Sequence, residues 1–162
     1  MTPEVAFDRL LEALVEGNVD FVVVGGLALG SWGVVRGTKD VDIVAAEDEE
    51  NRARLVAVAV DLGGHVQRAD MLVSSAFSIG ALLASEERVM IETPLGPLDV
   101  VRGLPGVPVY EELASRATEV SLLGVRVRVC SLSDLRAMKR AAGRTRDLAD
   151  LEDLDAARNP EI

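Results

Sequence analysis

Apolar residues in the first part of the chain recur with the spacing of helices and strands in alternation. Residues 3–16 have a helical pattern, and we expect a helix that Thr2 caps, that has Pro3 at its first position and that ends at Gly17. Its apolar face consists of Phe7, Leu10, Leu11, Leu14 and Val15. Residues 21–24 form a continuous apolar run, which predicts a strand buried on both faces.

Shorter apolar stretches continue this alternation. Residues 27–34 are expected to form a short helix and residues 40–44 a second strand. Residues 47–62 predict a helix that stops at Gly63 and Gly64. The pattern is weak between residues 65 and 83, where we expect a strand near Val66 and then an irregular segment from Met71 to Ile79.

The second half of the chain predicts two hairpins and a pair of helices. Residues 88–92 and 98–101 flank a turn rich in Pro and Gly, and residues 119–122 and 125–129 flank Leu123-Gly124. Helices are expected near residues 110–116 and over 133–142 and 145–157, the last two separated by Gly143. The fold class is therefore α/β (α+β), a mixed sheet flanked by helices with a C-terminal helical pair. We expect one α/β domain over residues 1–130, with residues 131–162 as a helical extension packed on it.

Composition narrows the classes of function. The 162 residues contain one cysteine and one histidine, which excludes a disulfide framework within the chain and metal sites that need two imidazoles. Carboxylates remain as ligands, and they suit Mg²⁺ or Mn²⁺. The formal net charge of −10 disfavours a broad grip on a nucleic-acid backbone. Neither a leader pattern nor a long apolar run is present, so we expect a cytoplasmic protein without a membrane partner.

Two glycines directly follow the first predicted strand. Gly25 and Gly26 permit close approach of a ligand to the backbone, and the free N–H groups that begin the next helix suit a phosphate. Glycine is equally common in strand-to-helix turns that bind nothing. A dinucleotide-binding turn fits less well, because Gly25, Gly26 and Gly30 have the spacing G-G-x-x-x-G rather than G-x-G-x-x-G.

Acidic residues interrupt two of the apolar strands. In a strand, Asp40 and Asp42 point the same way about 6–7 Å apart. Their charges repel by about 2 kcal/mol at an effective dielectric constant near ~20, a cost that a bound divalent cation removes. Asp99 lies in another apolar strand. Either these acids lie on solvent-exposed strand ends and edges, or they converge beside Gly25-Gly26 to share metal ions.

The order and spacing of Gly25-Gly26, Asp40-x-Asp42 and Asp99 resemble the nucleotidyltransferase superfamily of the DNA polymerase β type. More narrowly, residues 24–29, 36–44 and 132–150 are similar to the minimal, AbiEii-type nucleotidyltransferases, several of which are toxins of bacterial toxin–antitoxin pairs. The resemblance spans residues 21–154 and implies a nucleotidyltransferase-like fold.

The resemblance also implies a role for each motif. Asp40 and Asp42 would hold two Mg²⁺ (or Mn²⁺) ions, and Asp99 would ligate one of them and help to deprotonate the acceptor hydroxyl. Gly25-Gly26 would present backbone amides to the β and γ phosphates of an NTP. Many relatives have Ser at the second glycine; Ser31 is a candidate substitute, although it is equally well explained as an ordinary surface serine.

A basic stripe marks the first of the two C-terminal helices. It consists of Arg136, Lys139, Arg140 and Gly143, at helical spacing. In the resemblance, Lys139 reaches the triphosphate and Arg144 or Arg146 positions phosphate or acceptor. Alternatively, the stripe pairs with Asp147, Asp150 and Asp153 on the next helix. Both interpretations predict that substitution of Lys139 changes the stability of the ligand-free protein by less than about 1 kcal/mol.

The remaining chemical candidates are isolated. His65 is expected to be structural or exposed, and Cys130 to be a small buried hydrophobe.

These features favour an enzyme that transfers a nucleoside monophosphate from an NTP to a hydroxyl acceptor. The acceptor could be tRNA, a protein or a small molecule, and the acidic chain favours the last two. A toxin with an antitoxin partner is one form of this hypothesis. The alternatives are a catalytically silent nucleotide-binding or partner-binding module on the same fold, and a plain α/β domain whose aspartates are surface residues.

Overall fold

A six-stranded mixed sheet forms the centre of the computed structural model, which describes residues 5–158. Its order is β5-β6-β2-β1-β8-β7. The pairs β1/β8 and β2/β6 are parallel, and the pairs β1/β2, β5/β6 and β7/β8 are antiparallel. The strands are β1 (Phe21–Val24), β2 (Val41–Ala45), β5 (Arg88–Ile91), β6 (Leu98–Val101), β7 (Thr118–Leu122) and β8 (Val125–Val129). The predicted fold class, including both hairpins, is confirmed.

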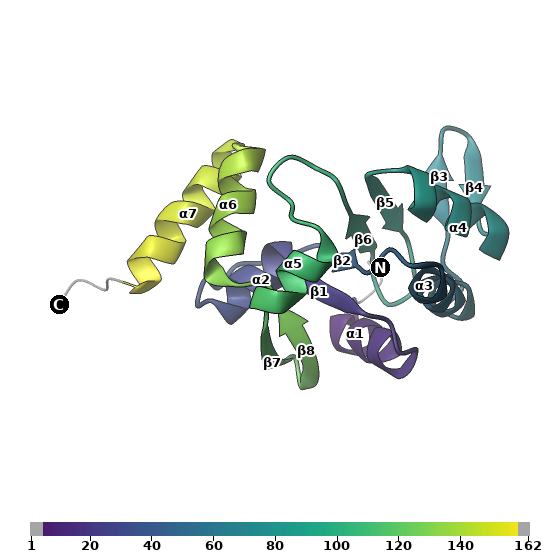
Figure 1. Cartoon of the computed structure of the whole chain (residues 1–162), viewed down its shortest axis with the longest axis horizontal. Helices are drawn as coiled ribbons and strands as arrows, with labels where there is room; N and C mark the ends of the chain where they lie inside the picture. Colours follow the sequence, from purple (N-terminus) through teal and green to yellow (C-terminus); the bar gives the residue numbers. More distant parts are fainter. Residues whose placement is uncertain (1–4, 159–162) are drawn as a thin grey trace.

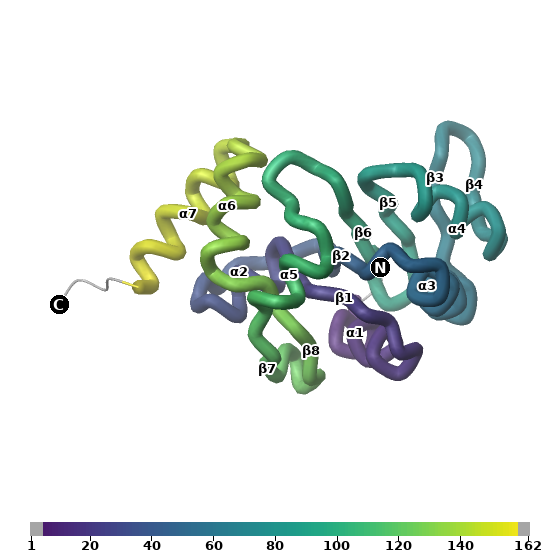
Figure 2. Tube along the Cα trace, in the orientation of Figure 1, coloured from purple at the N-terminus to yellow at the C-terminus, as the bar shows by residue number. Residues whose placement is uncertain are grey.

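Helices surround this sheet and extend the molecule at both ends (Figure 1). They are α1 (Phe7–Glu16), α2 (Gly25–Ser31), α3 (Glu49–Asp61), α4 (Ala76–Ser85), α5 (Tyr110–Arg116), α6 (Leu132–Ala142) and α7 (Thr145–Arg158). The tube in Figure 2 shows α6 and α7 side by side at one end, and α3 and α4 at the other, beside the small sheet of β3 (Val66–Arg68) and β4 (Met71–Val73). Among residues 5–158, no helix has the length and apolar character needed to cross a membrane.

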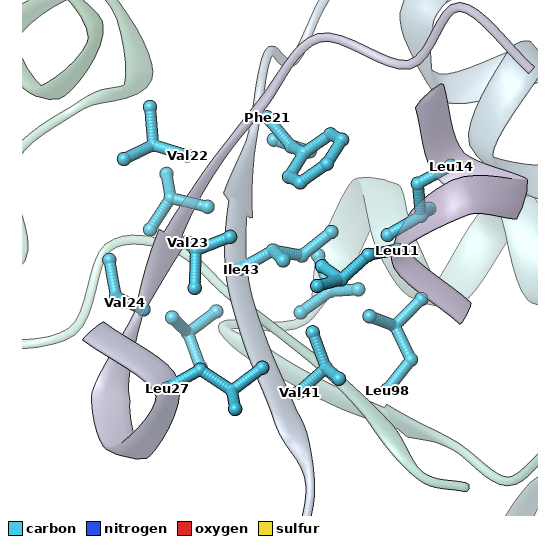
Figure 3. Packing of buried hydrophobic residues seen from close by; sticks show 14 of the residues in the cluster. Leu11, Leu14, Phe21, Val22, Val23, Val24, Leu27, Val41, Ile43 and Leu98 are labelled. Carbon is cyan, nitrogen blue, oxygen red and sulfur yellow. The ribbon is translucent and has the colours of Figure 1, made fainter. Parts of the chain in front are cut away.

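The core lies on both faces of β1, as its continuous apolar sequence predicts. All four of its residues are buried. On one face, Phe21 and Val23 point with Ile43 of β2 toward Leu11 and Leu14 of α1 (Figure 3). Val22 and Val24 point to the other face (Figure 3), because successive side chains of a strand point to opposite faces of the sheet. Burial on both faces makes β1 a rigid support for the turn that follows it.

The C-terminal helices share this core. Leu135 of α6 and Leu154 of α7 belong to the same buried cluster as the sheet residues. Gly143 separates the two helices in the left-handed conformation, with φ of 63°, as expected of a glycine after a helix C-terminus. The division of the chain at residue 131 stays a prediction.

Three element predictions need correction. The first helix begins at Phe7, because the N–H of Ala6 donates to the carbonyl of Leu95 at 2.8 Å and residue 6 has a non-helical conformation, with φ of −129° and ψ of 68°. Thr2 and Pro3 lie outside the described residues. The short second helix spans 25–31 rather than 27–34. The segment expected to be irregular contains β4 and the start of α4, which Ser75 caps by accepting a hydrogen bond from the N–H of Ser78.

Candidate active site

The central strands place two aspartates directly opposite each other. Asp42 of β2 is in register with Asp99 of its parallel neighbour β6 and, on its other side, with Val24 of β1. Asp40 precedes Asp42 by two residues and lies in a bend directly before β2. One carboxylate oxygen from each of the three aspartates lies within 4.8 Å of the others. The convergence predicted from the sequence is therefore confirmed.

The three carboxylates differ in exposure, since Asp40 and Asp42 are half-buried and Asp99 is buried. Asp99 is 1% exposed, and its Oδ1 is buried without a hydrogen-bond partner among the described residues. Burial, and then the charges of Asp40 and Asp99, raise the pKa of Asp42 from 3.8 to about 8. A divalent cation would relieve this repulsion and provide the partner that Oδ1 lacks. The all-oxygen donor set therefore fits Mg²⁺ or Mn²⁺.

Arg88 completes this acidic cluster, and the sequence analysis missed it. Its Nε donates to Oδ2 of Asp99 at 2.9 Å, and its Nη2 forms an ion pair with the same oxygen at 2.7 Å. Arg88 is opposite Val101 in the β5/β6 hairpin, two residues from Asp99 on the same strand face. The β5/β6 hairpin was predicted from the sequence. Pairing of its strands places Met90 opposite Asp99, and Arg88, two residues before Met90, could therefore have been expected near Asp99.

The glycine turn packs directly against the aspartates. Gly25 has φ of +68°, and a Cβ there would lie 2.0 Å from Oδ2 of Asp42. A Cβ on Gly26 would lie 2.6 Å from Oγ1 of Thr38, a hydroxyl that donates to the carbonyl of Asp40 at 3.0 Å. Both glycines are thus required by close approach to the loop that carries the aspartates, and not only by the turn.

A cleft of about 250 Å³ opens above this cluster. The loop between β6 and α5 forms one apolar wall with Leu104 and Val107, and α6 forms the other with Leu135 and Met138. Six of the chain's 17 Lys and Arg residues line it. They are Arg36, Lys39, Arg88, Lys139, Arg144 and Arg146. Four carboxylates also line the cleft, those of Asp40, Asp42, Asp99 and Asp147. In a chain with a net charge of −10, six basic side chains beside the three clustered aspartates suit a polyanion bound together with metal ions.

Lys139 is not part of an exposed stripe. Its side chain is 10% exposed, and Nζ lies 3.3 Å from Oδ1 of Asp147 and 2.9 Å from Oδ2 of Asp150. Burial alone would raise the pKa of Asp147, but hydrogen bonds from Arg144 and Lys139 and the Lys139 charge outweigh it and lower that pKa. The predicted pairing of Lys139 with Asp147 and Asp150 is confirmed. Because Lys139 is buried, we now expect its substitution to cost more stability than the sequence suggested, since two buried carboxylates would lose their shared cation.

The other ion pairs of α7 differ from the predicted set. Arg36, which the sequence analysis did not assign, pairs with Asp150 at 3.0 Å. Arg136 pairs with Asp155 at 2.8 Å, whereas Asp153 has no ion pair among residues 5–158. Arg36 thus ties α7 to the loop that leads to the aspartates.

Three other candidates lie outside the cleft. Ser31 is exposed at the end of α2 and does not line it. His65 forms a backbone bridge with Glu92. Cys130 is fully buried, and burial raises the pKa of its thiol to about 12. The expectations for His65 and Cys130 agree with these positions.

Solved structures with this fold include antibiotic-modifying enzymes. The lincosamide adenylyltransferase LnuA, bound to lincomycin, superimposes with a TM-score of 0.63 at 14% identity, over 93% of this chain and 95% of that chain. The antibiotic-resistance factor ANT(2'')-Ia gives a TM-score of 0.56 at 17% identity, over 94% and 86%. An antigenic nucleotidyltransferase-like protein from Paracoccidioides brasiliensis gives 0.55 at 17% identity, over 92% and 72%. At these identities the likeness establishes the fold.

Sequence comparison establishes the family. A search of curated proteins gave no match. Residues 6–159 match the family described as nucleotidyltransferase of unknown function (DUF6036). The match covers nearly the whole chain and contains the glycine turn and all three aspartates. The AbiEii-type subgroup is not established by either comparison. The chain belongs to this DUF6036 family of nucleotidyltransferases.

Proposed function

We propose that this protein transfers a nucleoside monophosphate from an NTP to a hydroxyl acceptor in a reaction that depends on divalent cations. The observation that carries the proposal is the convergence of Asp40, Asp42 and Asp99 within 4.8 Å beside the Gly25 turn. Membership of a nucleotidyltransferase family supports the reaction type.

Asp40, Asp42 and Asp99 would hold the cations, Mg²⁺ or Mn²⁺. When bound, these ions supply Lewis-acid polarisation of the α-phosphate and neutralise charge on the leaving pyrophosphate. In this proposal the Asp99 carboxylate also helps to deprotonate the acceptor hydroxyl. The Gly25-Gly26 amides face the β and γ phosphates in this proposal.

The triphosphate needs cations that are free to reach it. Arg144 is 63% exposed at the cleft, and Arg146 lines the cleft as well. We assign the direct phosphate contacts to these two arginines. Lys139 contributes charge to the cleft, and it also holds Asp147, which in turn binds Arg144 at 2.7 Å. Ser31 receives no role, because it does not line the cleft.

For the acceptor, we infer a small-molecule hydroxyl ahead of a protein side chain or tRNA. A structure of ANT(2'')-Ia holds adenylyl-2''-tobramycin, and LnuA was solved with lincomycin. The net charge of −10 disfavours a long RNA partner. These points support a small acceptor without naming it.

A toxin role with an antitoxin partner is the finer form of the proposal and depends on the AbiEii-type motifs alone. Expression of the wild type should then arrest growth, and expression of Asp42→Asn should not. Growth at the same rate in both cultures, with equal protein levels, would contradict the toxin role and leave the transfer reaction untouched.

The transfer reaction is tested with labelled nucleotides. The protein is incubated with each α-labelled NTP, Mg²⁺ or Mn²⁺, and cell extract, and the label is followed after nuclease or protease treatment to identify the acceptor class. We expect label from the α position in an acceptor, no label from the γ position, and neither with Asp42→Asn. NTP binding without transfer to any component would instead favour the catalytically silent module.

A further inference from the structure

Arg88 contacts only one of the two carboxylate oxygens of Asp99. Nε of Arg88 donates a hydrogen bond to Oδ2 at 2.9 Å, and Nη2 forms an ion pair with the same oxygen at 2.7 Å. The other oxygen, Oδ1, is buried and has no partner among the described residues. A buried carboxylate oxygen that accepts nothing is costly, so this arrangement requires an explanation.

A second arginine–carboxylate pair in the same molecule gives the comparison. Arg116 binds the buried Asp134 through Nε to Oδ2 at 2.9 Å and Nη2 to Oδ1 at 3.0 Å. The guanidinium fork there satisfies both oxygens, as is usual for such pairs. Asp134 does not line the cleft. The two pairs therefore differ: Arg116 binds both oxygens of Asp134, whereas Arg88 leaves Oδ1 of Asp99 unbound.

The strands explain how Arg88 reaches one oxygen only. Arg88 begins β5, an edge strand of the six-stranded sheet. It is opposite Val101, two residues beyond Asp99, so the two side chains are diagonal neighbours on one face of the hairpin. Arg88 approaches Asp99 from the β5 side, and Asp42 lies in register on the β2 side. Oδ1 is therefore the oxygen of Asp99 that Arg88 leaves available to the cluster formed with Asp40 and Asp42.

We propose that Arg88 is a positioning residue, which holds Oδ2 of Asp99 through the hydrogen bond from Nε and the ion-pair contact of Nη2 and so presents Oδ1 as a ligand for the divalent cation. The inference rests on the proposed function, because it assigns a metal to the three aspartates. The new element is that Arg88, a residue of β5 outside the acidic motif, fixes the orientation of the Asp99 carboxylate.

Charge alone predicts the opposite effect of removing Arg88. A guanidinium near a bound cation repels it, so loss of Arg88 through electrostatics would tighten cation binding. Loss of a residue that orients a metal ligand weakens binding, typically by about tenfold to hundredfold. The sign of the change separates the two explanations.

The test measures Mn²⁺ affinity of the ligand-free protein by the EPR signal of free Mn²⁺. We expect Arg88→Met to bind Mn²⁺ about tenfold to hundredfold more weakly than wild type. Arg116→Met, the matched control, should bind as wild type does. Equal or tighter binding by Arg88→Met would overturn the inference, as would an equal loss in Arg116→Met, since general loosening would then explain the result.

Arg88→Lys covers the case in which Arg88→Met does not fold. Lysine keeps the charge beside the buried Asp99 but lacks the two-donor fork. We expect weaker Mn²⁺ binding than in wild type, and wild-type affinity in this variant would overturn the inference.

Asp42→Asn separates this inference from the proposed function. If wild type binds no Mn²⁺, or if Asp42→Asn binds it as wild type does, the assignment of a metal site to the three aspartates is wrong. If Mn²⁺ binding is lost in Asp42→Asn but kept in Arg88→Met, only the role of Arg88 is wrong.

Discussion

Replacing Asp42 by Asn should stabilise the metal-free protein, although Asp42 is proposed to be essential for activity. Its pKa is raised in the folded state from 3.8 to about 8, chiefly by burial and then by Asp40 and Asp99. Between these two pH values the unfolded chain releases the proton while the folded protein keeps it, so stability falls as pH rises. Above pH 8 the penalty is constant, and below pH 3.8 it is absent.

The magnitude follows from the pKa difference. At about 1.4 kcal/mol for each pKa unit, the penalty is on the order of 2 kcal/mol at pH ~5 and on the order of 5 kcal/mol at pH ~8.5. Asparagine has nearly the same shape and no charge, so Asp42→Asn removes this pH dependence. We expect the free energy of unfolding of the variant to exceed that of wild type, by more at pH ~8.5 than at pH ~5.

The assay is urea unfolding in EDTA at both pH values, with Asp153→Asn as an exposed acidic control from α7. Added Mg²⁺ should then stabilise wild type by mass action and leave Asp42→Asn unchanged. The reasoning is refuted if Asp42→Asn is no more stable than wild type at pH ~8.5 in EDTA, or if its advantage is the same at pH ~5.

Three further substitutions test other parts of the site. Lys139→Met should lower the free energy of unfolding by about 3 kcal/mol, because two buried carboxylates lose the cation that they share. Arg140 is exposed, so Arg140→Met should change the free energy of unfolding by less than about 0.5 kcal/mol. Equal effects of the two substitutions in denaturant titrations would contradict the buried ion-pair network. Gly25→Ala should destabilise the fold and weaken Mn²⁺ binding, because the new Cβ meets a site carboxylate at 2.0 Å, and Gly37→Ala, with nothing within 4 Å, is its control. The lowered pKa of Asp147 adds stability that is lost as pH falls below the ordinary carboxyl range, so the melting temperature of Asp147→Asn should be less sensitive to acid than that of wild type.

Local sequence patterns determined most of the elements and the chemistry of the aspartates. A strand whose residues are all apolar is stable only when both of its faces are buried, so β1 and the glycine turn that follows it could be predicted. The two-residue period of a strand predicted that Asp40 and Asp42 point together, and their carboxylates do converge, although β2 begins only at Val41. The segment from Met71 to Ile79 was missed because β4 is three residues long and its Met71 and Leu72 are exposed, which leaves no alternation to detect.

Long-range pairing decided how those parts assemble. The sequence supplied Asp99 as an acid in an apolar strand, but only the parallel pairing of β6 with β2 placed it in register with Asp42. Pairing of β5 with β6 brought Arg88 to Asp99, and packing of α7 on α6 turned Lys139 from an apparent surface residue into a buried ion-pair partner. Helical and strand periods depend on neighbours within a few residues, whereas strand order and helix docking depend on which distant apolar faces bury each other. The sequence by itself could therefore identify the three carboxylates, and the tertiary structure decided which arginine and lysine side chains surround them.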